Sequence, residues 1–482
     1  MQRKWRVSLI VCVGVFMSSL DLFIVNIAFP AIARHFGGAS LASLSWILSG
    51  YAIVFAALLV PAGRWADAFG RKRAFLLGLG VFVGASAACA LAPSVGLLIA
   101  ARVVQAAGGA LMLPTSLGLM LPEFGPHERH VAIGAWAATG GIAAAAGPPL
   151  GGLLVQADWR WVFLVNVPIG LLGLAFGLRT LAERREPGAA RPDVLGAGAL
   201  IVAIAALVVA IVKGQEWGWG SARTVVPALV TAILLPAIWW RSERHPAPII
   251  EPAMLRVRSF GLAVGASVVF FGGFGAMLLA GVLFLTSVWH EGVLTAGLML
   301  FPGPAMATAF SVPSARLGAR YGYRLPGVVG SLMFAAGSLW FITRTGDRPA
   351  FLTEYLPGSM IGGAGVGLVI PTLTGAGASS LAPERFATGA AILTMGRQIG
   401  AALGVAILVA VLGASTTSAA DFHTAWLITV GGGIATALAL AAIGPPVRGA
   451  AVIPEPIADP LVAEPLVAEP LAAGPMAAEE AA

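Results

Sequence analysis

Uncharged apolar runs of about twenty residues recur along the whole chain. As a helix, each run is long enough to cross the ~30 Å hydrocarbon core of a bilayer. Only 11% of the 482 residues are charged, whereas soluble domains carry about 25% charged residues. Because so few charges cannot cover a soluble surface, the sequence predicts an all-α, multi-pass membrane protein.

Hydropathy separates about fourteen membrane-spanning helices. The predicted spans are 8–30, 45–65, 75–93, 95–120, 132–156, 161–179, 195–213, 224–240, 259–285, 294–313, 326–343, 355–375, 387–412 and 424–443. An even number of spans places both termini on the same side of the membrane.

The basic residues indicate which side that is. Most of them fall in the loops on the side of the N-terminus, including Arg3, Lys4, Arg71, Lys72, Arg73, Arg184, Arg241 and Arg256, whereas the opposite loops hold few, such as Arg34, Arg160, Arg344 and Arg348. Cytoplasmic loops of membrane proteins carry this excess of Lys and Arg. We therefore expect both termini in the cytoplasm of a bacterium, with the chain in its cell membrane. The bias also explains the net charge of +7 without a nucleic-acid partner.

Three pairs of segments repeat in the same order. The pairs are 63–70 with 315–322, 108–115 with 365–372, and Glu128-Arg129 with Glu384-Arg385, at offsets of 252, 257 and 256. The agreement predicts two related six-helix bundles, 1–185 and 259–445, with two inserted helices and an inner linker in 186–258. An even number of helices separates the copies, so they have the same orientation. Parallel repeats of this kind place a substrate site between the halves of a transporter.

The sequence indicates neither a cofactor nor a metal site. Cys12 and Cys89 both fall in apolar runs, so we expect two buried, inert thiols. The six histidines are spread over both predicted sides, and no segment resembles a phosphate-cradling P-loop. Residues 446–482 contain a degenerate Pro, Ala and Glu repeat, which predicts a disordered cytoplasmic tail.

Asp21 is the one carboxylate that the predicted spans place well inside the hydrocarbon. An acid at that depth is costly and marks a functional site by default. Arg102 is predicted within about 3 Å of the same depth, counting ~1.5 Å per helical residue from the outer ends of the two helices. Burial favours the neutral carboxyl, and a nearby cation favours the carboxylate. We therefore expect either a proton-exchanging site or a permanent structural ion pair.

The fifth span contains Gly147-Pro148 followed by Gly151-Gly152. Such residues are unfavourable inside a soluble helix. In a membrane bundle, small side chains let helices approach closely, and a proline kink shapes the contact. The stretch predicts either a seam between the two halves or ordinary helix packing.

Taken together, several motifs resemble the major facilitator superfamily, and within it the fourteen-helix drug:proton antiporters of the EmrB/QacA type. The motifs lie at 20–30, 63–73, 102–110, 147–152, 159–170 and 397–406, and the resemblance extends to about residue 445. Two positions depart from the family pattern. Ala106 follows Gln105 where glycine is usual, and Ala319 stands where the second copy of the loop motif would have aspartate.

The resemblance implies a proton-coupled exporter that works by alternating access and confers resistance to antibiotics or other toxic compounds. It implies that Gly147, Pro148, Gly151 and Gly152 form the antiporter seam. It also implies that Gly63, Asp67, Gly70, Arg71 and Arg73, in the inner loop after the second span, act as a latch that pairs with neighbouring helix ends. The alternative for these loop residues is a tight turn with ordinary positive-inside charges.

The expected substrate is a lipophilic small molecule, because aromatic faces with scattered amides suit such compounds. The candidate cavity residues are Phe23, Asn26, Gln105, Trp136, Phe271, Phe274, Phe284 and Gln398. His290 and Glu291 form either a second titrating site or a solvated loop pair. Arg397, taken as the inner start of its span, is expected to extend its charge to the membrane surface.

The sequence is also compatible with other functions. The chain could export one dedicated metabolite, such as an endogenous antibiotic or a siderophore. An integral membrane enzyme would need a cluster of His, Asp or Glu at one membrane face, which the sequence does not indicate. We expect a protein that functions as a monomer in the lipid bilayer, with protons and the substrate as its other partners.

Overall fold

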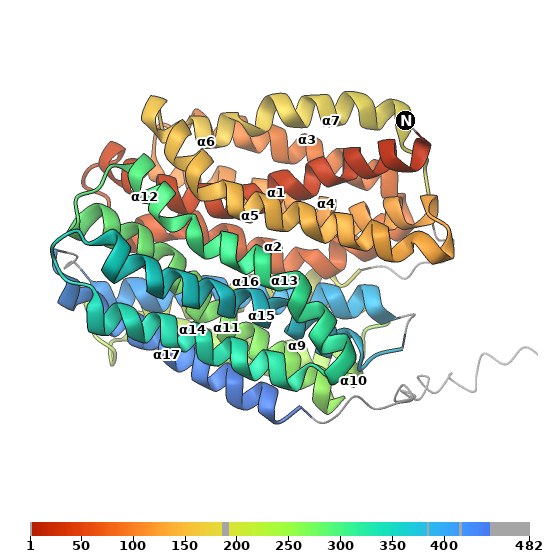
Figure 1. Ribbon diagram of the computed structural model, residues 1–482. Helices are drawn as coiled ribbons and strands as arrows, with labels where there is room; N and C mark the ends of the chain where they lie inside the picture. The colour runs from red at the N-terminus through yellow and green to blue at the C-terminus, as the bar shows by residue number, and fades with distance from the viewer. Residues whose placement is uncertain (1, 186–191, 383–384, 414–416, 444–482) are drawn as a thin grey trace, which may run out of the picture. The chain divides into compact units, whose positions relative to one another are not determined.

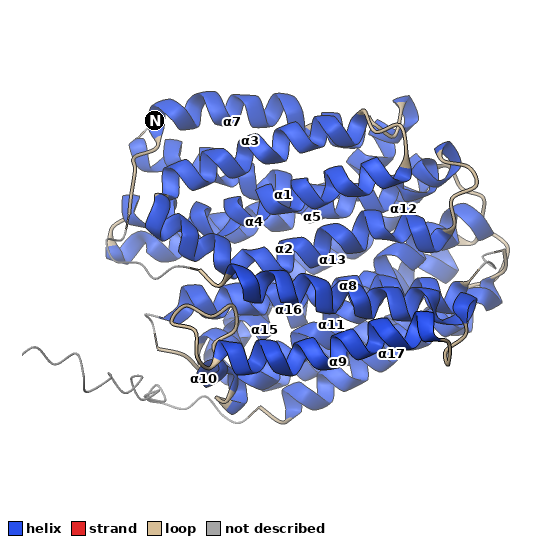
Figure 2. Ribbon diagram, turned by 180° about the vertical axis from the view of Figure 1, so that it is seen from behind, coloured by secondary structure: helices blue, strands red, loops and turns tan. Residues whose placement is uncertain are grey.

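The computed structural model describes residues 2–185, 192–382, 385–413 and 417–443, so the predicted tail lies outside the described residues. All regular elements among these residues are helical, as Figure 2 shows. The α-helices are α1 (Arg3–His35), α2 (Leu41–Phe69), α3 (Arg71–Ala90), α4 (Val95–Met120), α5 (Arg129–Ala157), α6 (Trp161–Leu164), α7 (Asn166–Thr180), α8 (Val194–Trp217), α9 (Ala222–Ser242), α10 (Pro252–Leu255), α11 (Arg258–Leu283), α12 (Val293–Leu300), α13 (Pro302–Tyr321), α14 (Arg324–Arg344), α15 (Leu356–Ala378), α16 (Phe386–Leu412) and α17 (Ala419–Ala441).

Fourteen helical segments of the described chain are long and apolar enough to cross a membrane, which confirms the predicted fold class. Five of these segments combine two helical elements. One contains α6 and α7, and another contains α12 and α13. A 3-10 turn at Leu121–Glu123 extends α4, and π-helical turns at Phe284–Val288 and Phe351–Tyr355 adjoin α11 and α15. Several helices continue beyond the predicted spans, and α1 begins at Arg3 rather than residue 8. A hydropathy pattern marks only the apolar part of a helix, so it does not detect polar helical turns at the ends of a span.

The long helices run alongside one another, with their connections at two ends of the bundle (Figure 1). We call the end that carries residues 71–73 the inner end and the opposite end the outer end, following the orientation predicted from the basic residues.

The internal repeat appears in the packing of equivalent helices. A Cβ on Gly108 of α4 would lie 2.7 Å from the carbonyl oxygen of Gly78 on α3, and a Cβ on Gly365 of α15 would lie 2.5 Å from that of Gly330 on α14. The two contacts are offset by 252 residues (78 to 330) and 257 residues (108 to 365), as in the sequence repeat. Glycine therefore permits the same close helix crossing in both halves.

The two halves meet along two sets of helices. On one side α2 packs along α16, and α8 packs against both of these helices while α9 packs on α8. On the other side α5 packs against α12, and α1 contacts α11 and α12. The two inserted helices are α8 and α9. They are joined at their inner ends by Arg241, whose Nε donates to the buried Asp193 carboxylate at 2.8 Å. Helices α8 and α9 therefore lie over the contact between α2 and α16. The predicted domain boundaries stay a prediction.

Candidate functional site

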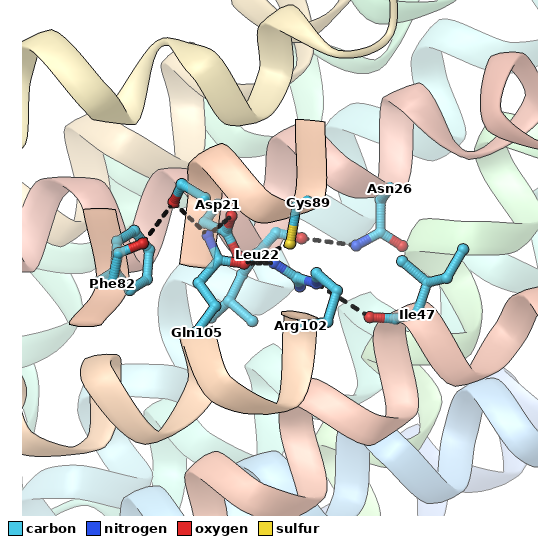
Figure 3. Close-up of polar contacts among 9 residues, drawn as sticks. Asp21, Leu22, Asn26, Ile47, Phe82, Cys89, Arg102 and Gln105 are labelled. Carbon is cyan, nitrogen blue, oxygen red and sulfur yellow. Dashed lines mark hydrogen bonds and ion pairs between the residues drawn. The ribbon is translucent and has the colours of Figure 1, made fainter. Parts of the chain in front are cut away.

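A buried polar cluster joins α1 to α4 in the first half. Asp21 of α1 is 0% exposed and Arg102 of α4 is 1% exposed, and their side chains form an ion pair between Asp21 Oδ2 and Arg102 Nη1. Gln105, one turn along α4, donates to Asp21 Oδ1 at 2.9 Å and accepts from Arg102 at 2.7 Å. Figure 3 shows these three side chains pointing toward one another between the helices.

The surrounding helices hold this cluster in place. Arg102 Nε donates to the Ile47 carbonyl of α2 at 3.1 Å, and the guanidinium lies 4.2 Å from the centre of the Tyr51 ring. Gln105 also donates to Ser86 of α3 at 2.9 Å. Sequence reasoning missed Tyr51 and Ser86, because a single Tyr or Ser in an apolar span carries no pattern that separates it from ordinary packing.

Both oxygens of Asp21 are therefore occupied by donors. Each oxygen keeps a further lone pair, but a proton on Asp21 removes the negative charge that holds the guanidinium, so protonation would weaken the Arg102 contact. Replacing a buried ion pair by apolar residues often leaves stability unchanged or raises it. Stability alone thus does not account for a charge pair at this depth.

A cavity of about 100 Å³ lies beside this cluster, between the two halves. Its walls come from α1, α2 and α4 of the first half and from α11 and α16 of the second. The lining residues are Leu22, Phe23, Asn26, Leu48, Ala52, Arg102, Phe271, Phe274, Gly275, Leu278, Gln398, Ala401, Ala402 and Val405. Arg102 lines the cavity, while Asp21 lies directly behind it through the ion pair. Ligand pockets for drug-sized molecules hold about 300–1,000 Å³, so this cavity must widen to bind one.

Five of the eight predicted cavity residues line this cavity: Phe23, Asn26, Phe271, Phe274 and Gln398.

The other three predicted residues do not line this cavity. Gln105 is fully buried and bonded to the Asp21–Arg102 pair. Trp136 donates from Nε1 to Ser116 at 2.8 Å and packs against the core of the first half. Phe284 is 0% exposed and belongs to an aromatic cluster near the outer end, with Trp289, Tyr355, Phe422 and Trp426.

The glycines of the fifth span bring α5 against α1 and against the second half. A Cβ on Gly147 would lie 2.5 Å from Phe23 Cβ, and one on Gly151 would lie 2.9 Å from a side-chain carbon of Ile24. Across the halves, a Cβ on Gly152 would lie 2.8 Å from Leu294 Cα. Reciprocally, a Cβ on Gly297 of α12 would overlap the Pro148 carbonyl oxygen.

An apolar cluster completes this contact at the outer end. Ile27, Val282 and Val293 are buried together, with Val155 and Leu300 packed against them. We call these five residues, together with residues 148–152, Leu294 and Gly297, the outer seal. The seal draws on α1 and α5 from one half and on α11 and α12 from the other, so it joins the two halves near the outer end.

The predicted latch residues lie at the turn between α2 and α3. Gly70 links the two helices with φ 121°, a left-handed conformation that favours glycine. Arg71 Nε donates to Asp67 at 2.7 Å, and its Nη1 donates to the Gly118 carbonyl of α4 at 3.3 Å. Gly63 faces Pro114 of α4, which its Cβ would meet at 3.4 Å. The loop motif therefore attaches the α2–α3 turn to the inner end of α4.

Glu183, just after α7, pairs with Arg73 of this turn. Its carboxylate lies 3.6 Å from Arg73 Nε and accepts from the Lys72 backbone at 3.1 Å. Elsewhere at the inner end, hydrogen bonds from Lys4 to both oxygens of Glu128, at 2.8 and 2.9 Å, lower the pKa of that exposed carboxyl. Sequence reasoning did not select Glu183, because its partner lies more than a hundred residues away.

A second inner contact joins the halves through the linker. Glu251 accepts from Arg64 of α2 at 2.7 Å and from Arg385, beside α16, at 3.3 Å. In the second copy of the loop motif, Gly322 again has a positive φ of 88°. Ala319 supplies no carboxylate there, and Arg320 lies 5.2 Å from the centre of the Tyr321 ring instead. The charge pairs thus involve the first copy of the motif and the linker.

His290 and Glu291 lie in the loop between α11 and α12, near the outer end. His290 is exposed with φ 54°, and the Glu291 backbone donates to the Leu285 carbonyl at 2.9 Å. The second titrating site proposed for these residues stays a prediction. In the described part of the chain, Cys12 is half-buried, Cys89 is buried, and no three His, Cys, Asp or Glu residues gather as metal ligands.

Arg397 lies in the interior of α16 rather than at its start, which corrects its expected position at the membrane surface. It is eleven residues after Phe386, or about 16 Å along the helix axis. Its guanidinium lies 5.4 Å from the centre of the Phe271 ring and donates to Thr374 of α15. A long side chain cannot reach the inner surface from this depth, so the charge stays within the bundle.

Comparison with known families and relatives agrees with this architecture. Residues 11–405 match the family model described as Major Facilitator Superfamily. The chain is 34% identical over 413 residues to the Multidrug resistance protein Stp of Mycobacterium tuberculosis, covering 85% of this chain and 76% of the relative. It is 33% identical to a Probable actinorhodin transporter of Streptomyces coelicolor, covering 87% of this chain and 75% of the relative.

A further relative and a solved structure extend the comparison. The chain is 35% identical to the Tetracenomycin C resistance and export protein of Streptomyces glaucescens, covering 84% of this chain and 75% of the relative. Among solved structures, it resembles a D-xylose–proton symporter with a TM-score of 0.67 at 14% identity, covering 93% of this chain and 99% of the symporter. At that identity the likeness concerns the fold alone.

Proposed function

The chain belongs to the major facilitator superfamily, and we propose that it is a proton-coupled exporter of lipophilic drugs or toxic compounds. The relatives are named for multidrug resistance, antibiotic resistance and export. In this proposal the proton gradient supplies the energy, no bound cofactor is needed, and the protein works as a monomer in the bilayer.

The Asp21–Arg102–Gln105 cluster is the observation that carries the proposal. Asp21 is fully buried in a membrane helix and lies behind Arg102, which lines the cavity between the halves. Loss of the carboxylate charge on protonation frees Arg102 from its counter-charge, so one proton changes the electrostatics of the cavity wall. A substrate and a proton that favour different conformations of the halves are exchanged across the membrane.

The direction of exchange follows from the predicted orientation. The arginines and lysines of the inner end support a cytoplasmic location for that end by the positive-inside rule. The outer seal then faces away from the cell, and in this proposal it closes the cavity toward the outside. Opening of the seal and closure of the inner end would release the substrate outside.

Transport by purified protein tests this function. The full chain is reconstituted in proteoliposomes, a pH gradient is imposed, and movement of a panel of dyes and antibiotics is measured. We expect movement of lipophilic compounds against their gradient, dependent on the pH gradient and abolished by a protonophore. If no compound moves when the gradient is imposed, the proposal is wrong.

The names of the relatives also support a second candidate. Several of them are named after a single compound, among them actinorhodin and tetracenomycin C, which favours a dedicated exporter of one metabolite. The same compound panel separates the two candidates, because a dedicated exporter moves one compound or one close group. No observation favours a membrane enzyme.

Substitution of Asp67 tests the latch. We expect Asp67→Asn to lower the export rate roughly two- to thirtyfold, the range in which single residues alter conformational coupling. Unfolding temperature should hardly change, because a half-exposed ion pair contributes little to stability and Arg71 keeps its bond to Gly118. Glu216→Gln, which breaks the Lys213–Glu216 pair at the outer end of α8, is the control and should leave export unchanged. Equal rates for both variants would mean that the charges near Gly70 serve only as topology signals.

A further inference from the structure

Arg397 is the charge in the membrane interior that the mechanism above does not use. The guanidinium sits between α11 and α15, over the ring of Phe271 and bonded to Thr374. Phe271 lines the cavity, and so does Gln398, the residue after Arg397. Ala401, one helical turn further, also lines it. Arg397 therefore lies at the inner edge of the cavity wall rather than against lipid.

This charge has no acidic partner in the described part of the second half. Arg102 is neutralised by Asp21, whereas Arg397 contacts a hydroxyl and an aromatic face. Its Nε is buried and makes no hydrogen bond within the described residues. Arg397 as a whole is half-buried, and a cation without a counter-charge at this depth of the bundle is costly. An anion that enters the cavity would supply both the missing charge and an acceptor for Nε.

We propose, on the basis of the proposed export function, that Arg397 selects substrates carrying an anionic group, a carboxylate or an ionised phenol, attached to an aromatic ring system. A guanidinium binds carboxylates through two parallel hydrogen bonds, which a point charge cannot do. The ring system lies against Phe23, Phe271 and Phe274, which line the same cavity.

Across the cavity, Asn26 offers a complementary group. Its amide nitrogen donates to the Leu22 carbonyl at 2.7 Å, while its buried Oδ1 has no donor within the described residues. The cavity wall thus has Gln398 next to Arg397 on α16 and one free acceptor, Asn26 Oδ1, on α1. A lipophilic compound with an anionic group at one end and a hydroxyl at the other satisfies both. Export of an anion is also favoured by a membrane potential that is negative inside.

Two dyes with the same three-ring frame test the charge preference. Carboxyfluorescein is anionic at neutral pH, whereas rhodamine 123 is cationic with its carboxyl blocked as an ester. Binding of each dye to the purified full chain is measured by fluorescence anisotropy, and gradient-driven uptake is measured separately in proteoliposomes. We expect the wild-type chain to bind carboxyfluorescein more tightly than rhodamine 123.

Variants of Arg397 test whether the preference for the anionic dye depends on this residue. We expect Arg397→Gln to weaken carboxyfluorescein binding about tenfold or more, since one unscreened charge contact is worth at least that factor, and to leave rhodamine 123 binding unchanged or tighter. Arg397→Lys keeps the positive charge but lacks the planar guanidinium with its paired donors, so it should retain part of the affinity. Arg344→Gln is the control, because Arg344 lies 5.4 Å from the centre of the Trp340 ring, the same distance as in the Arg397–Phe271 pair, but at the end of α14.

Several results would overturn the inference: tighter binding of the cationic dye, binding of neither dye, or equal weakening of both dyes by Arg397→Gln. An unfolding temperature lowered equally in Arg397→Gln and Arg397→Lys, with unchanged dye preference, would assign Arg397 a structural role. Failure of the proposed function is distinct, because it appears as absence of gradient-driven uptake across the whole compound panel even where a dye binds.

Discussion

Asp21→Asn should reduce proton-driven export to the level of protein-free vesicles. Asparagine keeps the shape of aspartate but cannot exchange a proton, so the link between protonation and the Arg102 contact is lost. Exchange of substrate down its own gradient should persist, because Asp21 lies behind the cavity wall rather than in it. Both reactions are measured in proteoliposomes, with and without a pH gradient.

The same variant should also be less stable, and a double variant separates the two effects. Breaking a buried ion pair by removing one partner costs about 3–5 kcal/mol, because the other charge stays buried alone. Asp21→Asn combined with Arg102→Gln removes both charges and should recover much of the unfolding temperature without recovering proton-driven export. Asp158→Asn, in the half-exposed outer pair with Arg160, is the control. If Asp21→Asn still couples export to the proton gradient, the pair is a permanent structural element.

The sequence alone predicted where along each helix the membrane-embedded charges and the closely packed glycines lie. An acid and an arginine in apolar spans are costly, and their depths follow from ~1.5 Å per helical residue, so helix geometry suffices to match Asp21 with Arg102. The close approach at Gly152 follows from the same kind of reasoning, because glycine in a membrane helix is favoured where two backbones come together.

The direction in which each helix face points was not predictable. Helices of this chain are apolar all round, so no polar stripe separates the faces toward lipid, protein and cavity. Phe271 and Phe284 are thirteen residues apart, about 3.6 turns, and therefore lie on opposite faces of their span; one lines the cavity and the other joins an aromatic cluster. Contacts such as Arg64–Glu251–Arg385 depend on which loops meet in space, which a single sequence does not encode locally.

A larger side chain in the outer seal should also have a large effect on export. Gly152→Val should shift the protein toward conformations open to the outside and lower export strongly. A side chain at 152 would overlap the backbone at Leu294, and overpacking of this kind costs about 1–3 kcal/mol. Since 1.4 kcal/mol is a factor of about ten in an equilibrium, the balance between closed and open outer ends should move by roughly five- to 150-fold. Gly297→Ala, which meets the Pro148 carbonyl from the other half, should act in the same direction.

Accessibility from outside the cell reports this shift directly. Leu278→Cys places a thiol in the cavity wall, and its reaction with a membrane-impermeant maleimide is followed in intact cells, with the wild-type chain as background for Cys12 and Cys89. We expect faster labelling when Gly152→Val or Gly297→Ala is added. Gly141→Val lies on the same helix and introduces the same residue, but a Cβ there meets nothing within 4 Å, so it should neither speed labelling nor slow export. If Gly152→Val and Gly141→Val behave alike, the glycines of α5 serve helix packing in general, and closure of the outer side must depend on other residues.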